Sequence, residues 1–574
     1  MLLHPRAALA LVLVSLVGLV ACAGDDGGTV GPDAGPTVTP DAPDPSDELF
    51  APDHLIEIAI ELPEAAWDTL RMQNRSADTL IGADCQAAPF PNPFTEQVAT
   101  VTVDGVRLEQ VGIRKKGFLG SLDDDKPSLK LDLDQTVPGQ NVAGLRGLTL
   151  NNNKQDPSAL RQCLAYQLFT AAGVPAPRCN FAHVTVNGRE LGVYTHVEAV
   201  GKRMLARHFA SNDGRLYEGT LSDFRPGWMA TFEPKTDEAN PDRSELEDLA
   251  AALTAPDDQL LARLAPLLDV DRFINFWAME TLIEHWDGYA NNTNNFFIYR
   301  DPSTGLIDFL PWGTDGVMAA PGADPPSQVV LAEGLLTRRL YLLPETRTRY
   351  VARMQALLDQ IWDEAALTTE LDRMRALIAV PLAVDVFAPR ADAAVAQADV
   401  RAFLASRAER VAPVLAAPPA WTQPLRTSFC FVDLGPVAAT FSTTFKNAEP
   451  PDFFAAGTGT LTGSISGVPI TTTRLGSNAA PGEDGRVAVQ LIGLVSATEV
   501  IVAVVNLRPD QVVAGGSAPI EVFSSYLFRF DPTTGAGEVI GFLLGGTIQF
   551  TAGGTTEGAP VVGSFSSRLF SVPF

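Results

Sequence analysis

The stretch "HWDGYANNTNNFFIYR", residues 285–300, decides how the fold of this chain is interpreted. It places a histidine, an aspartate and a run of asparagines between two strongly apolar segments. Polar side chains at that density form either a solvated loop or a functional site. Asparagines form turns and helix caps more often than metal sites, so the elements around the stretch must decide between the two.

The chain before this stretch changes from strand-like to helical patterns. Alternating runs such as "HLIEIAIEL" and "VATVTVDGVRL" predict strands over residues 51–113, and "SLKLDLD" alternates over residues 128–134. "DPSALRQCLAYQLFTAAG" has the start signal, the apolar spacing and the final Gly173 of a helix. The Asn187-Gly188 dipeptide then predicts a hairpin. Residues 199–284 and 327–415 have helical spacing.

The composition changes again after residue 425, beyond a linker at "APPAWTQP" (417–424). Short runs rich in Gly, Thr, Ser and Val, such as "GTGTLTGSISG" and "EVIVAVVNL", alternate with turns. This pattern predicts a separate all-β sandwich over residues 425–574. We find no cluster of catalytic residue types in it.

The charge of the chain restricts its partners. Acidic residues outnumber basic ones 68 to 42, which gives a formal net charge of −26. Nucleic acid and anionic lipid are bound by cationic surfaces. We therefore expect no nucleic-acid partner.

The N-terminus has the composition of an export signal. Arg6 precedes the apolar run "AALALVLVSLVGLV", which is short for a membrane span. "LVAC", ending at Cys22, resembles the lipobox of bacterial lipoproteins; a plain signal peptide is the alternative. We predict a lipoprotein signal peptide over residues 1–22 and a flexible Gly/Pro/Asp tether over residues 23–50. The protein is then an exported lipoprotein of the cell envelope or surface, anchored to the membrane through Cys22.

Four further cysteines, Cys85, Cys163, Cys179 and Cys430, are an even number in an oxidising compartment. Cys163 and Cys179 are close in sequence, and a disulfide between them would join a helix to the following strand. Zinc ligation is the alternative, but the spacing is not that of a zinc site.

The order of the elements indicates phosphoryl transfer. The chain has no GxxxxGK[ST], HExxH or GxSxG motif. Instead a lysine-bearing strand is followed by a helix, a hairpin, helices, the His-x-Asp loop and a short hairpin that ends at Asp315. Protein kinases have this order, with a lysine on the phosphates and Asp and Asn side chains at the acceptor hydroxyl and the metal.

Residues 51–412 resemble the spore coat protein H (CotH) kinase-like family. The resemblance lies in "VGIRKKGFLGS", "KPSLKLDL", "NGRELGVYTHVE", the stretch at 285–300 and "IDFLPWGTDG". It implies an α+β fold in which an atypical protein-kinase-like domain, residues 51–415, has an N-terminal β-rich lobe and a C-terminal helical lobe. It also implies ATP and Mg²⁺ as cofactors.

The resemblance assigns roles to several residues of this loop and the following hairpin. Asp287 stands at the position of the catalytic aspartate. Asn295, which precedes "FFIY", matches the metal-binding asparagine, and Asn292 is the alternative because it has the spacing of ordinary kinase loops. Asp315 matches the second acid of the family's W-D-x-D. Where the family has the first acid this chain has Gly313, which puts metal binding in doubt.

The resemblance also implies a nucleotide site. Lys126 is the preferred phosphate ligand, with Lys130, Arg114 and Lys116 as alternatives, and Glu198 is expected near the nucleotide. Together with the export signal, the resemblance implies a cell-envelope kinase that phosphorylates Ser or Thr of a surface or coat protein. An exported protein meets little ATP, so the alternative is a catalytically impaired kinase fold that serves as a surface binding, adhesion or structural protein.

Overall fold

The computed structural model describes residues 44–571, apart from residues 76–81, 83, 119, 240, 320–329, 388–389, 447–451, 483–484 and 521–523. The predicted signal peptide, Cys22 and the first part of the predicted tether lie outside these residues. The chain divides into two compact units. One contains residues 44–74 and Gln86–Leu425, and the other contains Arg426–Phe574 with the segment that leads to Cys85. None of the helices in the described ranges combines the length and the apolarity that crossing a membrane requires.

Seven strands of the first unit close into a barrel in the order β1-β2-β3-β4-β5-β7-β6. They are β1 (Leu55–Glu61), β2 (Gln97–Val103), β3 (Val106–Lys116), β4 (Ser128–Asp132), β5 (Gly147–Asn151), β6 (Cys179–Val186) and β7 (Arg189–Val197). The β1–β6 pair is parallel. Alternate residues of β1, Ile56, Ile58 and Ile60, point into the barrel core, as the sequence pattern predicts. Leu49, near the end of the predicted tether, is also buried in this core.

Local sequence signals explain one turn of the barrel and the helix that packs on it. Asn187 and Gly188 have φ of 51° and 73° and form the two-residue turn between β6 and β7, which confirms the predicted hairpin. α2 (Glu64–Arg71) buries Trp67 and Leu70 against the barrel and exposes its charged face.

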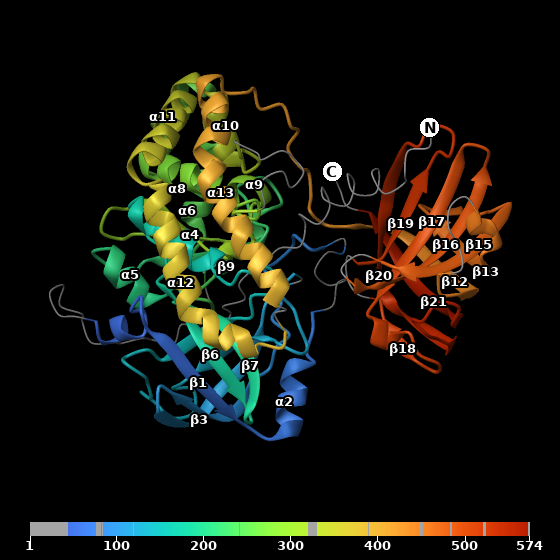
Figure 1. Ribbon diagram of the computed structural model, residues 1–574. Coiled ribbons are helices and arrows are strands. Elements are labelled where there is room, and N and C mark those ends of the chain that lie inside the picture. The colour runs from blue at the N-terminus through green and yellow to red at the C-terminus, as the bar shows by residue number, and fades with distance from the viewer. Residues whose placement is uncertain are drawn as a thin grey trace. The chain divides into compact units, whose positions relative to one another are not determined.

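Most of the other elements of this unit are helices, in agreement with the predicted α+β class (Figure 1). They are α4 (Arg161–Ala171), α5 (Lys202–His208), α6 (Ser244–Ala252), α7 (Asp257–Leu264), α8 (Val270–Leu282), α9 (Tyr289–Asn292), α10 (Leu335–Leu342), α11 (Pro344–Gln360), α12 (Glu364–Val384) and α13 (Arg390–Ala416). The short 3-10 turns are η1 (Pro45–Glu48), η2 (Met229–Thr231) and η3 (Thr314–Gly316). α4 ends where the sequence predicts, because Gly173 takes φ +76° just beyond it.

A small sheet lies among these helices, in the strand order β11-β10-β8-β9. Its strands are β8 (Arg215–Gly219), β9 (Glu233–Pro234), β10 (Phe296–Arg300) and β11 (Ile307–Pro311). The central helix α8 packs on β11 and on α11. Trp277 of α8 stacks on Tyr350 of α11 with ring centroids 3.9 Å apart. Residues 285–295 therefore connect two buried elements, α8 and β10.

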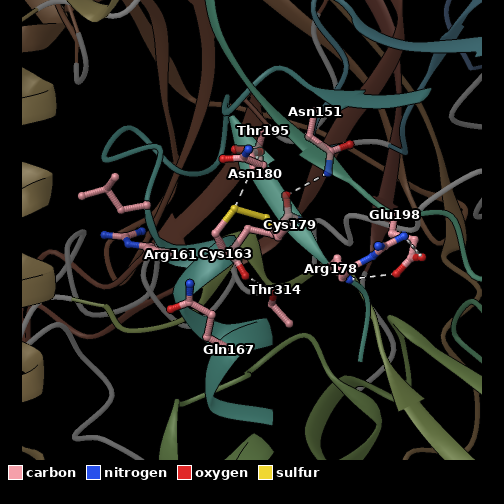
Figure 2. Close-up of a disulfide and its surroundings, with 12 residues drawn as sticks. Asn151, Arg161, Cys163, Gln167, Arg178, Cys179, Asn180, Thr195, Glu198 and Thr314 are labelled. Atoms are coloured by element: carbon pink, nitrogen blue, oxygen red, sulfur yellow. Dashed lines mark hydrogen bonds and ion pairs between the residues drawn. A yellow bond between two sulfur atoms is a disulfide. The ribbon is translucent and has the colours of Figure 1, made fainter. Parts of the chain in front are cut away.

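A disulfide joins Cys163 of α4 to Cys179 of β6 (Figure 2). Their Cα atoms are 5.1 Å apart, within the range that a disulfide requires. The bond fixes α4 to β6, the barrel strand that follows it in the chain. A second disulfide, Cys85–Cys430, lies in the other unit.

The strands of the C-terminal unit form one ten-stranded sheet, in place of the two sheets of the expected sandwich. The order is β14-β13-β12-β21-β20-β19-β17-β16-β15, and β18 pairs with β20. The strands are β12 (Val432–Thr444), β13 (Thr458–Ile465), β14 (Val468–Pro469), β15 (Arg474–Pro481), β16 (Val487–Ser496), β17 (Glu499–Leu507), β18 (Ser517–Pro519), β19 (Tyr526–Phe530), β20 (Gly537–Ala552) and β21 (Pro560–Ser571), with 3-10 turns at η4 (Asp452–Ala455) and η6 (Pro509–Gln511).

Bulges explain why one sheet encloses a core. The register of the pairs that β21 makes with β12 and β20 shifts at three places, among them Leu544/Thr547, and such shifts bend a strand and increase its twist. An isolated bridge between Phe445 and Ala479 links the end of β12 to β15. The alternating pattern predicts the strands, but it does not show where a continuous sheet turns back on itself.

Candidate active site

The stretch at 285–300 folds around the carboxylate of Asp287. The Asn292 side-chain amide donates to Oδ1 at 2.6 Å, and the Asn295 amide donates to Oδ2 at 2.7 Å. Asp287 is only 3% exposed. Both asparagines that the sequence proposed as metal ligands thus contact the predicted catalytic aspartate, one at each oxygen, and fix the plane of its carboxyl group.

The backbone of this loop enters the left-handed region twice, a conformation that asparagine tolerates and a β-branched residue disfavours. Thr293 and Asn295 have φ of 53° and 51°, and the left-handed region costs a β-branched residue about 1–2 kcal/mol. Neighbouring elements hold the loop there: Ser222 N donates to Thr293 O at 2.7 Å, and Trp312 N donates to Asn295 O at 3.1 Å. Such imposed backbone geometry is typical of functional sites.

His285 supports the loop and is not a base. Its ring is fully buried, and Nε2 donates to the Trp312 carbonyl oxygen at 3.0 Å. Burial lowers the pKa of His285 to about 4, so the imidazole is neutral at pH 7. The hydrogen bond ties the start of the loop to the end of β11.

The segment Gly313–Gly316 packs against the same loop. Gly313 has φ +51°, and a Cβ built on it would lie 2.5 Å from Oδ1 of Asn295. A Cβ on Gly316 would lie 2.9 Å from the indole nitrogen of Trp286. Asp315 stands in the chain between these two closely packed glycines. An acid at position 313, as in the family, is therefore incompatible with the present position of the Asn295 side chain.

Among the proposed phosphate ligands, Lys116 lies beside Trp312, directly before this segment. Its Nζ is 5.5 Å from the centre of the Trp312 ring and donates to Asn151 Oδ1 at 3.0 Å. Asn151 in turn donates to Gln162 Oε1 at 2.8 Å. The end of β3 thus brings a buried ammonium group to the residue that precedes Gly313.

Lys126, the preferred phosphate ligand, contacts a different element. Its Nζ donates to Asp385 Oδ2 at 2.6 Å and to the Val193 carbonyl at 3.0 Å. Burial lowers the pKa of Lys126, and Asp385 opposes that shift. The ammonium group joins the barrel to the residue that caps α12.

Glu198 and the two remaining cations also lie in the barrel part of the unit. Glu198 Oε1 accepts from Arg178 Nη2 at 2.8 Å, and Glu198 also pairs with Arg207 (Figure 2 shows Arg178 and Glu198). Arg114 and Lys130 are partners across the β3–β4 pair. Asp287, Asn292, Asn295 and the 312–316 segment thus converge with Lys116, whereas Lys126 and Glu198 are held by other partners.

Two carboxylates of this region have no counterpart in the sequence prediction. Asp385 follows α12, and no local signal marks it as the partner of Lys126. Glu280 lies on α8, and its two oxygens accept from the backbone N–H groups of Tyr289 and Ala290 at 3.0 and 2.9 Å. A glutamate inside the apolar run "FINFWAMETLI" is the signal that would have identified it, because buried charges require partners.

The donor set fits a hard cation at the Asp287 loop. Oδ1 of Asn295 is buried without a hydrogen-bond partner, which is unusual for an acceptor. Mg²⁺ binds oxygen ligands, keeps several waters and needs only one or two carboxylates. Within the described ranges, no three His, Cys, Asp or Glu side chains gather as a complete metal site. A Mg²⁺ ion here would rely on the amide oxygen of Asn295, the carboxylate of Asp315 and phosphate oxygens.

Residues 113–401, half of the chain, match the family model described as CotH kinase protein. Inner spore coat protein H of Bacillus subtilis is 26% identical over 220 residues, which are 36% of this chain and 60% of that protein. Invasin CotH2 of Rhizopus delemar is 27% identical over 185 residues, 29% of this chain and 31% of the invasin. The chain therefore spans less than two thirds of these relatives.

A solved structure, the Helicobacter pylori proinflammatory kinase CtkA, aligns with 50% of this chain and 90% of its own length. The identity is 10% and the TM-score is 0.25.

Proposed function

Because the chain belongs to the CotH kinase family, we propose that it is an atypical kinase that transfers the γ-phosphoryl group of ATP to Ser or Thr of a surface or coat protein. The observation that carries the proposal is the fixed carboxylate of Asp287. Two amide donors hold both of its oxygens, in a loop whose strained backbone is supported by neighbouring elements. A carboxylate held in this way is positioned to orient an acceptor hydroxyl.

Asp287 orients the acceptor hydroxyl and accepts its proton as the phosphoryl group leaves the nucleotide. Phosphoryl transfer depends mostly on positioning and on charge neutralisation. Because the carboxylate is already held at both oxygens, it loses little conformational freedom when the acceptor binds. Each amide donor occupies one lone pair of its oxygen, and a second lone pair remains to accept from the hydroxyl group of the acceptor.

Asn295 and Asp315 would hold Mg²⁺, which neutralises phosphate charge when it is bound. Lys116 is the cation that we assign to the phosphates, because it lies beside Trp312. Lys126 serves as an internal brace to α12, since its ion pair with Asp385 is buried.

We further propose that the protein acts outside the cytoplasm as a lipoprotein anchored through Cys22. One observation favours a second function. Gly313 replaces a family acid, and Asn295 occupies the space that the missing side chain would need. A kinase fold with weakened metal binding would then serve as a surface binding or adhesion protein. Partner binding that survives Asp287→Ala is the result that favours this alternative.

Thermal shift measurements on the full chain test the proposal. ATP with Mg²⁺ is expected to raise the melting temperature of the wild type, and Lys116→Met and Asp315→Asn are expected to reduce that shift. Lys126→Met is the matched control. It removes a buried lysine that forms an ion pair with Asp385, and it is expected to leave the nucleotide-dependent shift unchanged. No shift in the wild type, together with no transfer from labelled ATP, contradicts the kinase function.

A further inference from the structure

We propose that Glu280 is the positioning residue of the Asp287 loop. Its buried carboxyl group fixes the backbone of residues 288–290 and so sets the direction in which Asp287 presents its carboxylate. The inference rests on the proposed function, and it adds a residue that touches neither acceptor nor nucleotide.

The carboxyl group of Glu280 binds the first N–H groups of α9. Oε1 accepts from Tyr289 N and Oε2 from Ala290 N, and the side chain is completely buried. N–H groups at the start of a helix have no partner within the helix, and Gly288, which precedes α9, provides no side chain to cap them. Glu280 reaches them from α8 and replaces the missing cap.

The turn that carries Asp287 wraps around this carboxyl group. His285 N donates to the Glu280 backbone carbonyl at 2.8 Å, and Gly288 N donates to His285 O at 3.0 Å. A Cβ on Gly288 would lie 2.9 Å from Cδ of Glu280 and 2.7 Å from Cδ2 of His285. Glycine directly after Asp287 therefore lets the backbone approach Glu280.

Glu280 itself is carried on a rigid element. On its two sides along α8, Trp277 stacks on Tyr350 and Thr281 Oγ1 accepts from the Tyr350 hydroxyl at 2.8 Å. A functional side chain keeps its geometry when the residues behind it are locked by packing and hydrogen bonds. Burial raises the pKa of Glu280 to about 8, against the effect of the two backbone N–H groups. Both oxygens face backbone N–H donors, so a glutamine reproduces one of the two contacts and turns its NH2 group toward the other N–H.

Steady-state kinetics of the full chain test the inference. Glu280→Ala is expected to lower kcat about 10²-fold, the effect of a misplaced reacting group, and to leave the KM for ATP unchanged. Glu280→Gln keeps an acceptor oxygen for one of the two N–H groups and is expected to recover only part of that loss, because its NH2 group cannot accept from the other N–H. Asp363→Ala is the matched control, because Asp363 also accepts from two backbone N–H groups, at the start of α12. This variant is expected to keep the kcat of the wild type.

Hydrogen exchange provides a readout that does not depend on activity. The amides of Tyr289 and Ala290 are expected to exchange faster in Glu280→Ala, with unchanged protection in α11. If the wild type is active and Glu280→Ala matches Asp363→Ala in kcat, the inference is wrong while the proposed function stands. If the wild type transfers no phosphoryl group, the proposed function fails. Unchanged exchange at residues 289–290 in Glu280→Ala, or in Glu280→Gln should the alanine variant not fold, then overturns the anchoring role as well.

Discussion

Replacing Gly313 with alanine is expected to destabilise the fold at the Asp287 site. The residue has φ +51°, and its added Cβ would meet the side-chain amide of Asn295. The left-handed backbone costs an alanine about 1–2 kcal/mol, and forcing a methyl group into a packed site costs about 1–3 kcal/mol. The stiffer unfolded chain returns about 0.4–1 kcal/mol. The free energy of unfolding should therefore fall by about 1–5 kcal/mol, with a central value of about 3 kcal/mol.

Gly105→Ala separates the two contributions. Gly105 has φ +82°, and no atom lies within 4 Å of the position that a Cβ would take, so this variant has the backbone cost alone, about 1 kcal/mol. Urea denaturation followed by tryptophan fluorescence reports on one unit, since all seven tryptophans lie between residues 67 and 421. If Gly313→Ala is no more destabilising than Gly105→Ala, Asn295 does not fill the space beside residue 313. A clash with Asn295 would then not explain the missing family acid.

Three further outcomes follow from buried groups. The pKa of His285 is lowered to about 4, so the unfolded chain binds an extra proton below pH 6.5 and stability is lost as the pH falls toward 4. His285→Gln should reduce the loss between pH 7 and pH 5 by about 2 kcal/mol, and urea midpoints at the two pH values check this. Asp385→Ala strands the ammonium group of Lys126 and should cost about 3–5 kcal/mol, whereas Asp385→Ala with Lys126→Met should cost clearly less; equal costs would contradict the buried pair. Opening the Cys163–Cys179 disulfide, which closes a loop with a sequence separation of 16, should cost about 3 kcal/mol, measured as the urea midpoint of Cys163→Ser/Cys179→Ser; an unchanged midpoint contradicts this.

Local signals predicted the elements but not the long-range partners of the site. Strand alternation, the Asn187-Gly188 turn and the helix end at Gly173 are short-range features, and the structure contains all three. The convergence of Asn292 and Asn295 on Asp287 also follows from spacing within one loop.

Short-range sequence signals could not distinguish the roles of Lys116 and Lys126. The two residues stand at neighbouring strands, and their environments differ only because Trp312 and Asp385 reach them from distant parts of the chain. The C-terminal unit illustrates the same limit. Alternating runs such as "GTGTLTGSISG" and "EVIVAVVNL" predict strands there, whereas the path of one continuous sheet depends on bulges that leave no clear local pattern.

Phosphoryl transfer by Asp287→Asn, compared with the wild type, tests the central claim most directly. The asparagine has nearly the same shape but cannot accept the proton of the acceptor hydroxyl. Incorporation of labelled phosphate from ATP with Mg²⁺ is expected in the wild-type chain or in a Ser-rich protein, and Asp287→Asn should reduce it about 10²–10⁴-fold while the nucleotide-dependent thermal shift remains. Equal incorporation by the two proteins would contradict the assignment of Asp287 as the catalytic residue.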